Sequence, residues 1–310
     1  MNRRAAILGA GGALLACGLP ARSAQTVSVL YADSLVTLFE RTLVPALQAR
    51  GYTLNAEGRG SVANANMIRE GLKRPDVFIS ADAGLMDRLL AAPNPTVRWY
   101  ATFATTRLAL AYSPASPFAA RFRDVAAGRA TWYDVLQTPG LKLGRTDPAV
   151  DPKGYRSIIA LELADHLYHQ PLRQRILGDD RNSAQIFPSE SLLVRIEQNE
   201  LDVAFVYSVE AAARHLPSIE LPATINLSDP RRAAEYAAAR VTINGVAHAG
   251  APIAFAFTIP SDAANADGAL AVLRFIASGD GRAMAEAGGL TMRPLGFHGD
   301  LHAVPAGLAP

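Results

Sequence analysis

The sequence predicts an α/β protein built from two open sheets of mainly parallel strands flanked by helices. Short β-rich runs alternate with stretches of helical apolar spacing between residues 26 and 82, and the alternation resumes after residue 107. A repeated strand–helix order of this kind is typical of doubly wound parallel sheets. The only cysteine is Cys17. The chain after residue 24, about 285 residues long, is large enough to bury a core without disulfides.

The first group of elements follows the order β-α-β-α-β. In its first helix, Leu35, Phe39 and Leu43 recur at a spacing that places them on one helical face. Gly51 ends this helix. The predicted elements are a strand over 26–31, a helix over 35–50, a strand over 52–58, a helix over 62–74 and a strand over 75–82.

The second group repeats the alternation and ends in a long apolar strand and closing helices. Ligands of open α/β sheets bind beyond the carboxyl ends of strands, so loops leading from a strand into a helix are candidate sites. The predicted elements are strands over 107–112, 141–146, 201–207 and 251–260, and helices over 132–137, 155–169, 210–216 and 268–288.

Residues 1–24 have the features of a secretory leader. Arg3 and Arg4 form a positive start, and the apolar run that follows is too short for a mature membrane span. Three export routes stay open: lipidation of Cys17 within LLAC, ordinary cleavage near Ala24, and twin-arginine export. All three place the mature chain outside the cytoplasm. We therefore expect a periplasmic or extracytoplasmic protein, anchored to the membrane if Cys17 carries a lipid.

The charge balance argues against several classes of partner. The formal net charge is +2, and removal of residues 1–24 takes away three arginines and no acidic residue, which lowers it to about −1. This balance implies no basic face for nucleic acid and no charged tail. We expect a monomer that binds no nucleic acid.

Two serines stand where a predicted strand gives way to a helix. Ser34 lies in ADS and Ser61 in GRGS. Serine at this position commonly caps a helix by accepting a backbone N–H of the first turn. Alternatively, free N–H groups and the positive end of the helix dipole favour an anion, to which a serine hydroxyl adds a donor. Both interpretations stay open for each serine.

Acidic residues occupy two further helix starts. The loop DPAVDPKGYRS places Asp151 and Pro152 directly before a helical pattern, and Glu190 opens the helix that follows FPS. Asp is a good cap, proline suits the first helical position, and an acid suits the helix dipole. Tyr207 ends a strand and could be a half-buried aromatic or a cleft residue. These patterns by themselves indicate helix starts as readily as a binding site.

Nothing in the sequence supports an enzyme. GRGSV does not have the order of a nucleophile elbow, and the glycines at 9–12 lie within the leader. His166 and His169 have an HxxH spacing but no third metal ligand near them in the sequence. We expect no cofactor.

Several stretches of the chain follow one another in the order found in one protein family. They are VSVLYADSLVTLFE, EGRGSVANANMIREG, RPDVFISAD, LKLGRTDPAVDPKGYRS, PSESLLVRIEQNELDVAFVYS and LPATINLSDP. Over nearly all of the chain after the leader, the sequence resembles periplasmic molybdate/tungstate-binding proteins, the receptors of ABC importers. The combination of DPxGYRS with PSE and ELDxAFxY is similar to the tungstate-type branch of that family.

The resemblance implies a type II periplasmic-binding fold, in which two α/β lobes close on a ligand. It implies a first lobe over 26–110 and 245–310 and a second lobe over 111–244. It also implies the residues that face the cleft. They are Asp33, Ser34 and Ser61 from the first lobe, and Ala149, Val150, Asp151, Glu190 and Tyr207 from the second.

The resemblance also gives the acids a chemical role. A carboxylate beside a dianion is repelled unless its oxygen binds the metal of the oxyanion. In similar proteins one Asp and one Glu complete an octahedron around molybdenum or tungsten, and Asp151 and Glu190 match those positions. Sulfate and phosphate cannot expand their coordination in this way. Val150 and Lys153 depart from residues frequent among relatives. A tetrahedral, hydrogen-bonded site held by Ser34, Ser61 and Tyr207 is the alternative geometry.

The resulting hypothesis is a non-enzymatic receptor that captures molybdate or tungstate and delivers it to a membrane permease. A separate ATPase would power transport, because this chain has no P-loop. The alternatives are a receptor for another tetrahedral oxyanion, such as sulfate, and an exported hydrolase.

Overall fold

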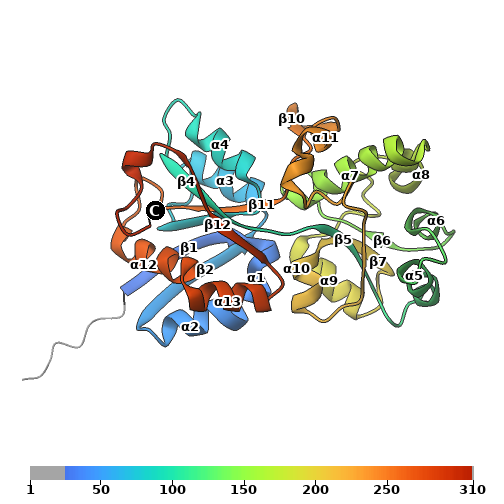
Figure 1. The fold of residues 1–310 in the computed structure, drawn as a ribbon, viewed down its shortest axis with the longest axis horizontal. Helices are drawn as coiled ribbons and strands as arrows, with labels where there is room; N and C mark the ends of the chain where they lie inside the picture. Colours follow the sequence, from blue (N-terminus) through green and yellow to red (C-terminus); the bar gives the residue numbers. More distant parts are fainter. Residues whose placement is uncertain (1–24, 309–310) are drawn as a thin grey trace, which may run out of the picture.

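The computed structural model describes residues 25–308, which fold into two lobes that lie side by side (Figure 1). Each lobe contains a sheet with helices packed against it. The predicted leader over 1–24, with Cys17, lies outside the described residues. Among the residues that are described, no helix is both long and apolar enough to cross a membrane.

The first lobe is built around a six-stranded sheet with the order β12-β4-β11-β3-β1-β2. Strands β1 to β4 run in one direction, whereas β11 and β12 run in the opposite direction. Of its neighbouring pairs, β1–β2 and β1–β3 are parallel and the other three are antiparallel, so the sheet is mixed rather than mainly parallel as predicted. Its strands are β1 (Gln25–Ala32), β2 (Tyr52–Arg59), β3 (Val77–Ser80), β4 (Trp99–Thr105), β11 (Ala254–Thr258) and β12 (Thr291–Gly299).

Helices cover both faces of this sheet, with α3 and α4 on one side and α12 and α13 on the other (Figure 1). Buried apolar side chains of the helices and strands form its core. The helical segments are η1 (Asp33–Leu35), α1 (Val36–Leu38), η2 (Phe39–Leu43), α2 (Val44–Gln48), α3 (Ser61–Arg69), α4 (Ala83–Leu90), α12 (Ala266–Ala277), α13 (Gly279–Ala287) and η4 (Leu301–Ala303).

The helix predicted over 35–50 contains an irregular turn. The segment Phe39–Leu43 is π-helical, and Pro45 follows it closely. Proline has no N–H to donate to the carbonyl four residues earlier, so a regular α-helical ladder cannot run through it. Leu35, Phe39 and Leu43 are all buried, so the predicted apolar face is kept.

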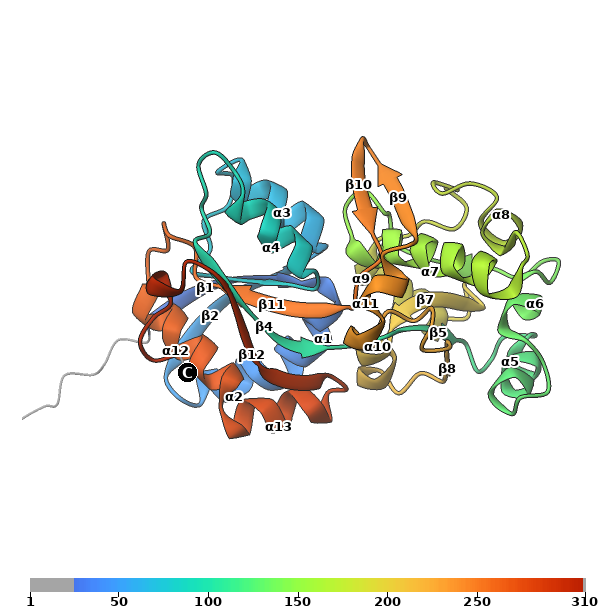
Figure 2. The same cartoon turned by 45° about the horizontal axis from the view of Figure 1, so that its top comes forward.

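The second lobe is built around a four-stranded sheet with the order β6-β7-β5-β8. Strands β6, β7 and β8 run in one direction, and β5 runs against them. A hairpin of β9 and β10 projects beside α3 and α4 of the first lobe (Figure 2). The elements are β5 (Leu108–Tyr112), α5 (Ala119–Ala126), α6 (Trp132–Leu136), β6 (Leu143–Gly144), α7 (Pro152–Tyr168), α8 (Leu172–Leu177), α9 (Ser189–Glu197), β7 (Val203–Tyr207), α10 (Ser208–Ala213), β8 (Ser218–Glu220), η3 (Pro230–Arg232), α11 (Ala233–Tyr236), β9 (Arg240–Ile243) and β10 (Val246–Ala249).

The chain crosses between the lobes twice. It leaves the first sheet at the end of β4, enters the second at β5, and returns from β10 to β11 (Figure 1). The predicted boundary between 110 and 111 falls within β5, and the one between 244 and 245 falls in the turn of the β9–β10 hairpin. Loops at the inner ends of both sheets therefore face each other across the junction.

The predicted fold class is confirmed, but several elements differ from the prediction. The strand expected over 141–146 is reduced to Leu143–Gly144, and Arg145 adds only an isolated bridge to Ile186. Strands β4 and β12 and helix α4 were not predicted. Strand β12 contains Pro294 and lies at the sheet edge, where proline is tolerated and strand patterns are weak.

Candidate oxyanion site between the lobes

The N-terminus of α7 presents Asp151 at the junction of the lobes. Asp151 is the N-cap of this helix, its Oδ1 accepts the N–H of Lys153 at 2.8 Å, and Pro152 occupies the first turn. This confirms the interpretation of the loop as a helix start. Asp151 is 3% exposed, and its Oδ2 has no hydrogen-bond partner. A buried carboxylate oxygen without a hydrogen bond is costly. Capping therefore explains the position of Oδ1 but not the burial of Oδ2.

The two serines do not cap their helices. Ser34 lies within η1, whose N-cap is Ala32, and Ser61 is the first residue of α3, whose N-cap is Gly60. Both serines are buried, and the Oγ of Ser34 has no hydrogen-bond partner. The simple capping interpretation is therefore wrong for both side chains. Segment η1 packs against α9 and α10 of the second lobe, which places Ser34 at the junction.

Two hydroxyl groups, one from each lobe, are held with their own protons free to donate. The Oγ of Ser61 accepts the N–H of Ala81 at 3.0 Å. The hydroxyl oxygen of Tyr207 accepts an N–H of Arg156 at 2.6 Å. Since each oxygen already accepts a hydrogen bond, its O–H is left as the donor. Donors of this kind suit an oxyanion that carries no proton of its own.

Lys153 is a buried cation that the sequence interpretation did not place in the site. It is 1% exposed, and its Nζ lies 2.6 Å from Glu210 Oε1, 3.1 Å from Ser189 Oγ and 3.9 Å from Asp151 Oδ2. The other oxygen of Glu210 accepts the N–H of Tyr207 at 2.7 Å. Lys153 therefore joins the starts of α7, α9 and α10 around one positive charge.

Arg156 is a second buried cation that sequence reasoning missed, although it lies in the segment DPAVDPKGYRS. It donates to the carbonyl of Ala81 at 2.7 Å and to Tyr207, and it pairs with Asp82 at 3.3 Å. Ala81 and Asp82 follow β3 of the first lobe, whereas Arg156 and Tyr207 belong to the second. The signal in the sequence was a pair of cations, Lys153 and Arg156, near the start of a helix, where the helix dipole disfavours them.

The electrostatics of the site are set by acids that outnumber nearby cations. Burial, and next the charge of Asp33, raise the pKa of Asp151 to about 7, while Lys153 opposes the rise. Burial also raises the pKa of Tyr207, so its hydroxyl stays protonated. Burial would lower the pKa of Lys153, but Glu210, Asp151 and Asp33 raise it above its usual value. The charged Lys153 favours an incoming anion beside these acids.

A cavity of about 280 Å³ opens beside Asp151. Its walls come from both lobes. The lining residues are Asp33, Gly60, Thr146, Asp147, Val150, Asp151, Ile186, Phe187, Pro188 and Ser189. Four of the loops and helix starts discussed above therefore border one space, although Ser34, Ser61 and Tyr207 are not among the residues that line it.

The backbone N–H groups of the 149–151 loop, which was predicted to face the cleft, already donate within the loop. The N–H of Ala149 donates to Asp147 Oδ1 at 2.8 Å, and the N–H groups of Val150 and Asp151 donate to the Asp147 carbonyl at 3.2 and 3.1 Å. The Val150 carbonyl instead accepts the N–H of Ala63, from the first lobe, at 3.3 Å. This loop contacts the opposite lobe, and Asp147 organises it.

Two further predictions concern acids and histidines. Glu190 lies in the first turn of α9, one residue after Ser189, but its side chain lies outside the described residues. His166 and His169 lie at the C-terminal end of α7. Within the described part of the chain, no group of three or more His, Cys, Asp or Glu side chains could hold a metal ion.

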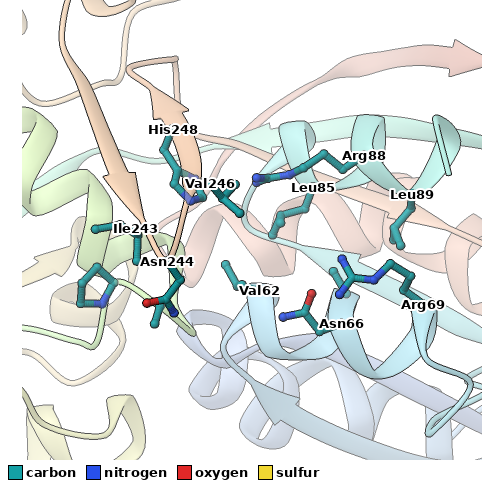
Figure 3. A pocket seen from close by; sticks show the side chains of 13 residues that line it. Val62, Asn66, Arg69, Leu85, Arg88, Leu89, Ile243, Asn244, Val246 and His248 are labelled. Carbon is teal, nitrogen blue, oxygen red and sulfur yellow. The ribbon is translucent and has the colours of Figure 1, made fainter.

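A second cavity, of about 230 Å³, lies between α3 and α4 on one side and the β9–β10 hairpin on the other. Figure 3 shows the side chains of Val62 and Leu85 facing Ile243, Val246 and His248 across it. Ala149 also lines this cavity, so the 149–151 loop separates the two spaces. Both cavities lie where the lobes meet.

Comparisons with known proteins agree with this geometry. The chain matches the model for bacterial extracellular solute-binding proteins over residues 27–291. It is 38% identical over 275 residues to a protein of Haloferax volcanii named as an ABC transporter molybdenum-binding protein, with 86% of this chain and 85% of that one covered. It is 28% identical over 252 residues to a molybdate/tungstate-binding protein of Pyrococcus abyssi, with 74% and 72% covered.

The fold also matches solved structures. The periplasmic molybdate-binding protein of Azotobacter vinelandii aligns with a TM-score of 0.61 at 16% identity, over 86% of this chain and 99% of that one. At this identity the likeness shows the fold alone, which is the predicted type II periplasmic-binding fold.

Proposed function

This chain belongs to the family of bacterial extracellular solute-binding proteins, and from that premise we propose that it captures molybdate or tungstate between its lobes. The ligand would be a tetrahedral dianion, and the protein would hand it to the membrane permease of an ABC importer. Relatives whose names refer to molybdenum, molybdate and tungstate support this choice of ligand.

The observation that carries the proposal is a pair of buried polar atoms without hydrogen-bond partners. They are Ser34 Oγ from the first lobe and Asp151 Oδ2 from the second. Buried polar atoms are rarely left unpaired, because each lost hydrogen bond is costly. A ligand that accepts from a serine and is bound by a carboxylate would satisfy both atoms.

We place the oxo groups of the ligand against Ser34, Ser61 and Tyr207, whose hydroxyls would donate to them. Asp151 and Glu190 would bind the metal centre, and Asp33 with the 149–151 loop would close the site around it. Lys153 offsets the accumulated negative charge, since the ligand brings two further negative charges to a cluster of acids. Sulfate has no vacant coordination sites for the carboxylates, so it would lose those two bonds.

The cellular role follows from the family. We propose that the mature chain acts in the periplasm or otherwise outside the cytoplasm after loss of its leader, either free as a monomer or anchored to the membrane by a lipid on Cys17. It would catalyse no reaction and need no cofactor. Its partners would be the permease and the separate ATPase of the importer. We place the lobe boundaries at the two crossings, near 107 and 250, because β5 belongs to the second sheet and the β9–β10 hairpin packs against α7 of the second lobe.

A crystal structure of the chain with tungstate tests this proposal directly. Tungsten scatters anomalously, so its position can be found without reference to the protein. We expect one peak between Ser34, Ser61, Asp151 and Tyr207, with the Asp151 carboxylate in contact with the metal. A peak elsewhere, or none at millimolar tungstate, would contradict the proposal. A peak at the site with all contacts made through oxo groups would support the tetrahedral geometry instead.

A further inference from the structure

We propose that Asp82 is a positioning residue that latches the two lobes together by receiving Tyr155 and Arg156 from α7. This inference rests on the proposed function, which it extends from the ligand contacts to the closure of the cleft. Asp82 lies between β3 and α4 in the first lobe, and both of its partners lie in the second. It contacts none of the atoms proposed to hold the ligand.

The contacts of Asp82 account for both of its carboxylate oxygens. Oδ1 accepts the N–H of Gly84 at 2.9 Å, which caps α4, and lies 3.3 Å from the Arg156 guanidinium. Oδ2 accepts the hydroxyl of Tyr155. Burial alone would raise the pKa of Asp82, but the charge of Arg156 and these hydrogen bonds hold it below its usual value. The carboxylate is therefore charged while it bridges the lobes.

The contacts of Asp82 with Tyr155 and Arg156, called the latch below, are joined to the proposed ligand residues by a continuous chain of hydrogen bonds. Ser61 accepts the N–H of Ala81, the carbonyl of Ala81 accepts Arg156, and Arg156 donates to Tyr207. Ser61 and Tyr207 therefore reach each other across the lobes through Ala81 and Arg156. The guanidinium of Arg156 bonds Ala81 of the first lobe and Tyr207 of its own lobe, so the closed arrangement and the placement of the Tyr207 hydroxyl depend on the same group.

Packing keeps the partners of Asp82 in place from the side of the second lobe. The ring of Tyr155 stacks on His248 of β10, with centroids 4.0 Å apart and an interplanar angle of 24°. Tyr155 and Arg156 are 2% and 3% exposed. Because both partners are fixed to one lobe and Asp82 to the other, opening the cleft breaks these contacts without disturbing the interior of either lobe.

The test compares Asp82→Asn and Tyr155→Phe with Asp87→Asn as control. In Asp82→Asn the side chain can still cap α4, but it has no charge to pair with Arg156 and one oxygen fewer to accept the Tyr155 hydroxyl. In Tyr155→Phe the ring still stacks on His248, but the hydroxyl that donates to Asp82 is lost. Asp87 also lies on α4, but its bond, to Tyr100 at 2.7 Å, stays within the first lobe.

Interlobe distance is the readout. The chain after residue 24 has no cysteine, so spin labels at Leu72→Cys and Leu167→Cys report one distance between the lobes; both positions are exposed. We expect the population at the short distance to fall at least about twofold in both latch variants, with and without molybdate, and to be unchanged in the control. The melting temperature of each ligand-free variant shows whether a lobe itself has been damaged.

Each outcome decides one question. Wild-type distances in Asp82→Asn, or a wild type that never populates the short distance, would overturn the latch. An equal loss in the Asp87→Asn control would also overturn it. Failure of molybdate to bind the wild type would count against the proposed function, while the ligand-free distances would still decide the latch.

Discussion

Asp151 divides two roles between its two carboxylate oxygens. One caps α7 through the N–H of Lys153, and the other is buried without a partner. Helix capping needs an oxygen acceptor only, whereas binding a metal centre needs a negative charge at the free oxygen. A change that keeps the acceptor and removes the charge therefore separates the roles.

Asp151→Asn is expected to weaken tungstate binding at least about tenfold without lowering the melting temperature of the ligand-free protein. Asparagine caps helices about as well as aspartate, but its amide is a poor ligand for molybdenum or tungsten. Calorimetric titration and thermal unfolding measure the two effects. Equal losses of affinity and stability would return Asp151 to a purely structural role.

The same residue predicts how stability depends on pH. Burial and Asp33 raise the pKa of Asp151 in the folded chain from 3.8 to about 7. Between these values the folded state holds a proton that the unfolded state has lost, so the free energy of unfolding contributed by this group falls as pH rises. It is fully present below about pH 4 and lost above about pH 7.

The expected result is that Asp151→Asn gains stability relative to the wild type as pH rises from about 4 to about 7, both without ligand. Denaturant unfolding of both chains across that range measures the difference, in which the contributions of other titrating groups cancel. A difference that does not change with pH would contradict the raised pKa.

At the scale of elements, the first turn of α7 lies tightly against the loop before it. A Cβ added to Gly154 would lie 2.6 Å from the backbone N of Pro148 and 2.6 Å from the carbonyl O of Thr146. Backbone atoms cannot move aside as a flexible side chain can. Glycine at this position therefore sets the distance between the 146–151 loop and the helix that carries Lys153 and Arg156.

Gly154→Ala is expected to destabilise the protein by about 1–3 kcal/mol and to weaken ligand binding as well, because α7 must shift. Gly279→Ala is the control, since Gly279 also starts a helix and nothing lies within 4 Å of its added Cβ. It should be neutral or stabilising by up to about 1 kcal/mol. Similar unfolding midpoints for the two variants would show that the contact at Gly154 relaxes easily.

The sequence was informative about elements whose local pattern matches their environment. Helix starts at Asp151 and Glu190 and the buried strands β1, β3 and β7 follow from apolar runs and capping residues. The roles of Lys153 and Arg156 could not be predicted in this way. Their partners Glu210 and Asp82 are distant in sequence, and a cation has the same local pattern whether it is solvated or buried in an ion pair.

At the scale of the whole molecule, the two lobes meet through backbone as well as side chains. A Cβ on Gly60 would lie 2.3 Å from the carbonyl oxygen of Val150 in the opposite lobe, and the N–H of Ala63 donates to that same oxygen. The lobes thus approach as closely as backbone allows. The three atoms nearest that Cβ all belong to Val150 and Asp151 of the second lobe, so the clash arises where the lobes meet.

Gly60→Ala is therefore expected to hold the lobes apart without weakening either one. With saturating tungstate, its radius of gyration from small-angle scattering should stay above that of the wild type, while the ligand-free melting temperature should be unchanged. If tungstate lowers the radius of gyration of the variant to the wild-type value, the backbone at the junction can shift to accommodate the added methyl group.

The most direct test of the central claim, capture of molybdate or tungstate, is calorimetric titration of the chain from residue 25 with tungstate, molybdate and sulfate in turn. The account predicts tight one-to-one binding of tungstate and molybdate, with no measurable heat from sulfate at the same concentrations. Sulfate binding of similar strength would leave a general oxyanion receptor and make Asp151 a structural residue. The absence of heat with all three anions would contradict the account.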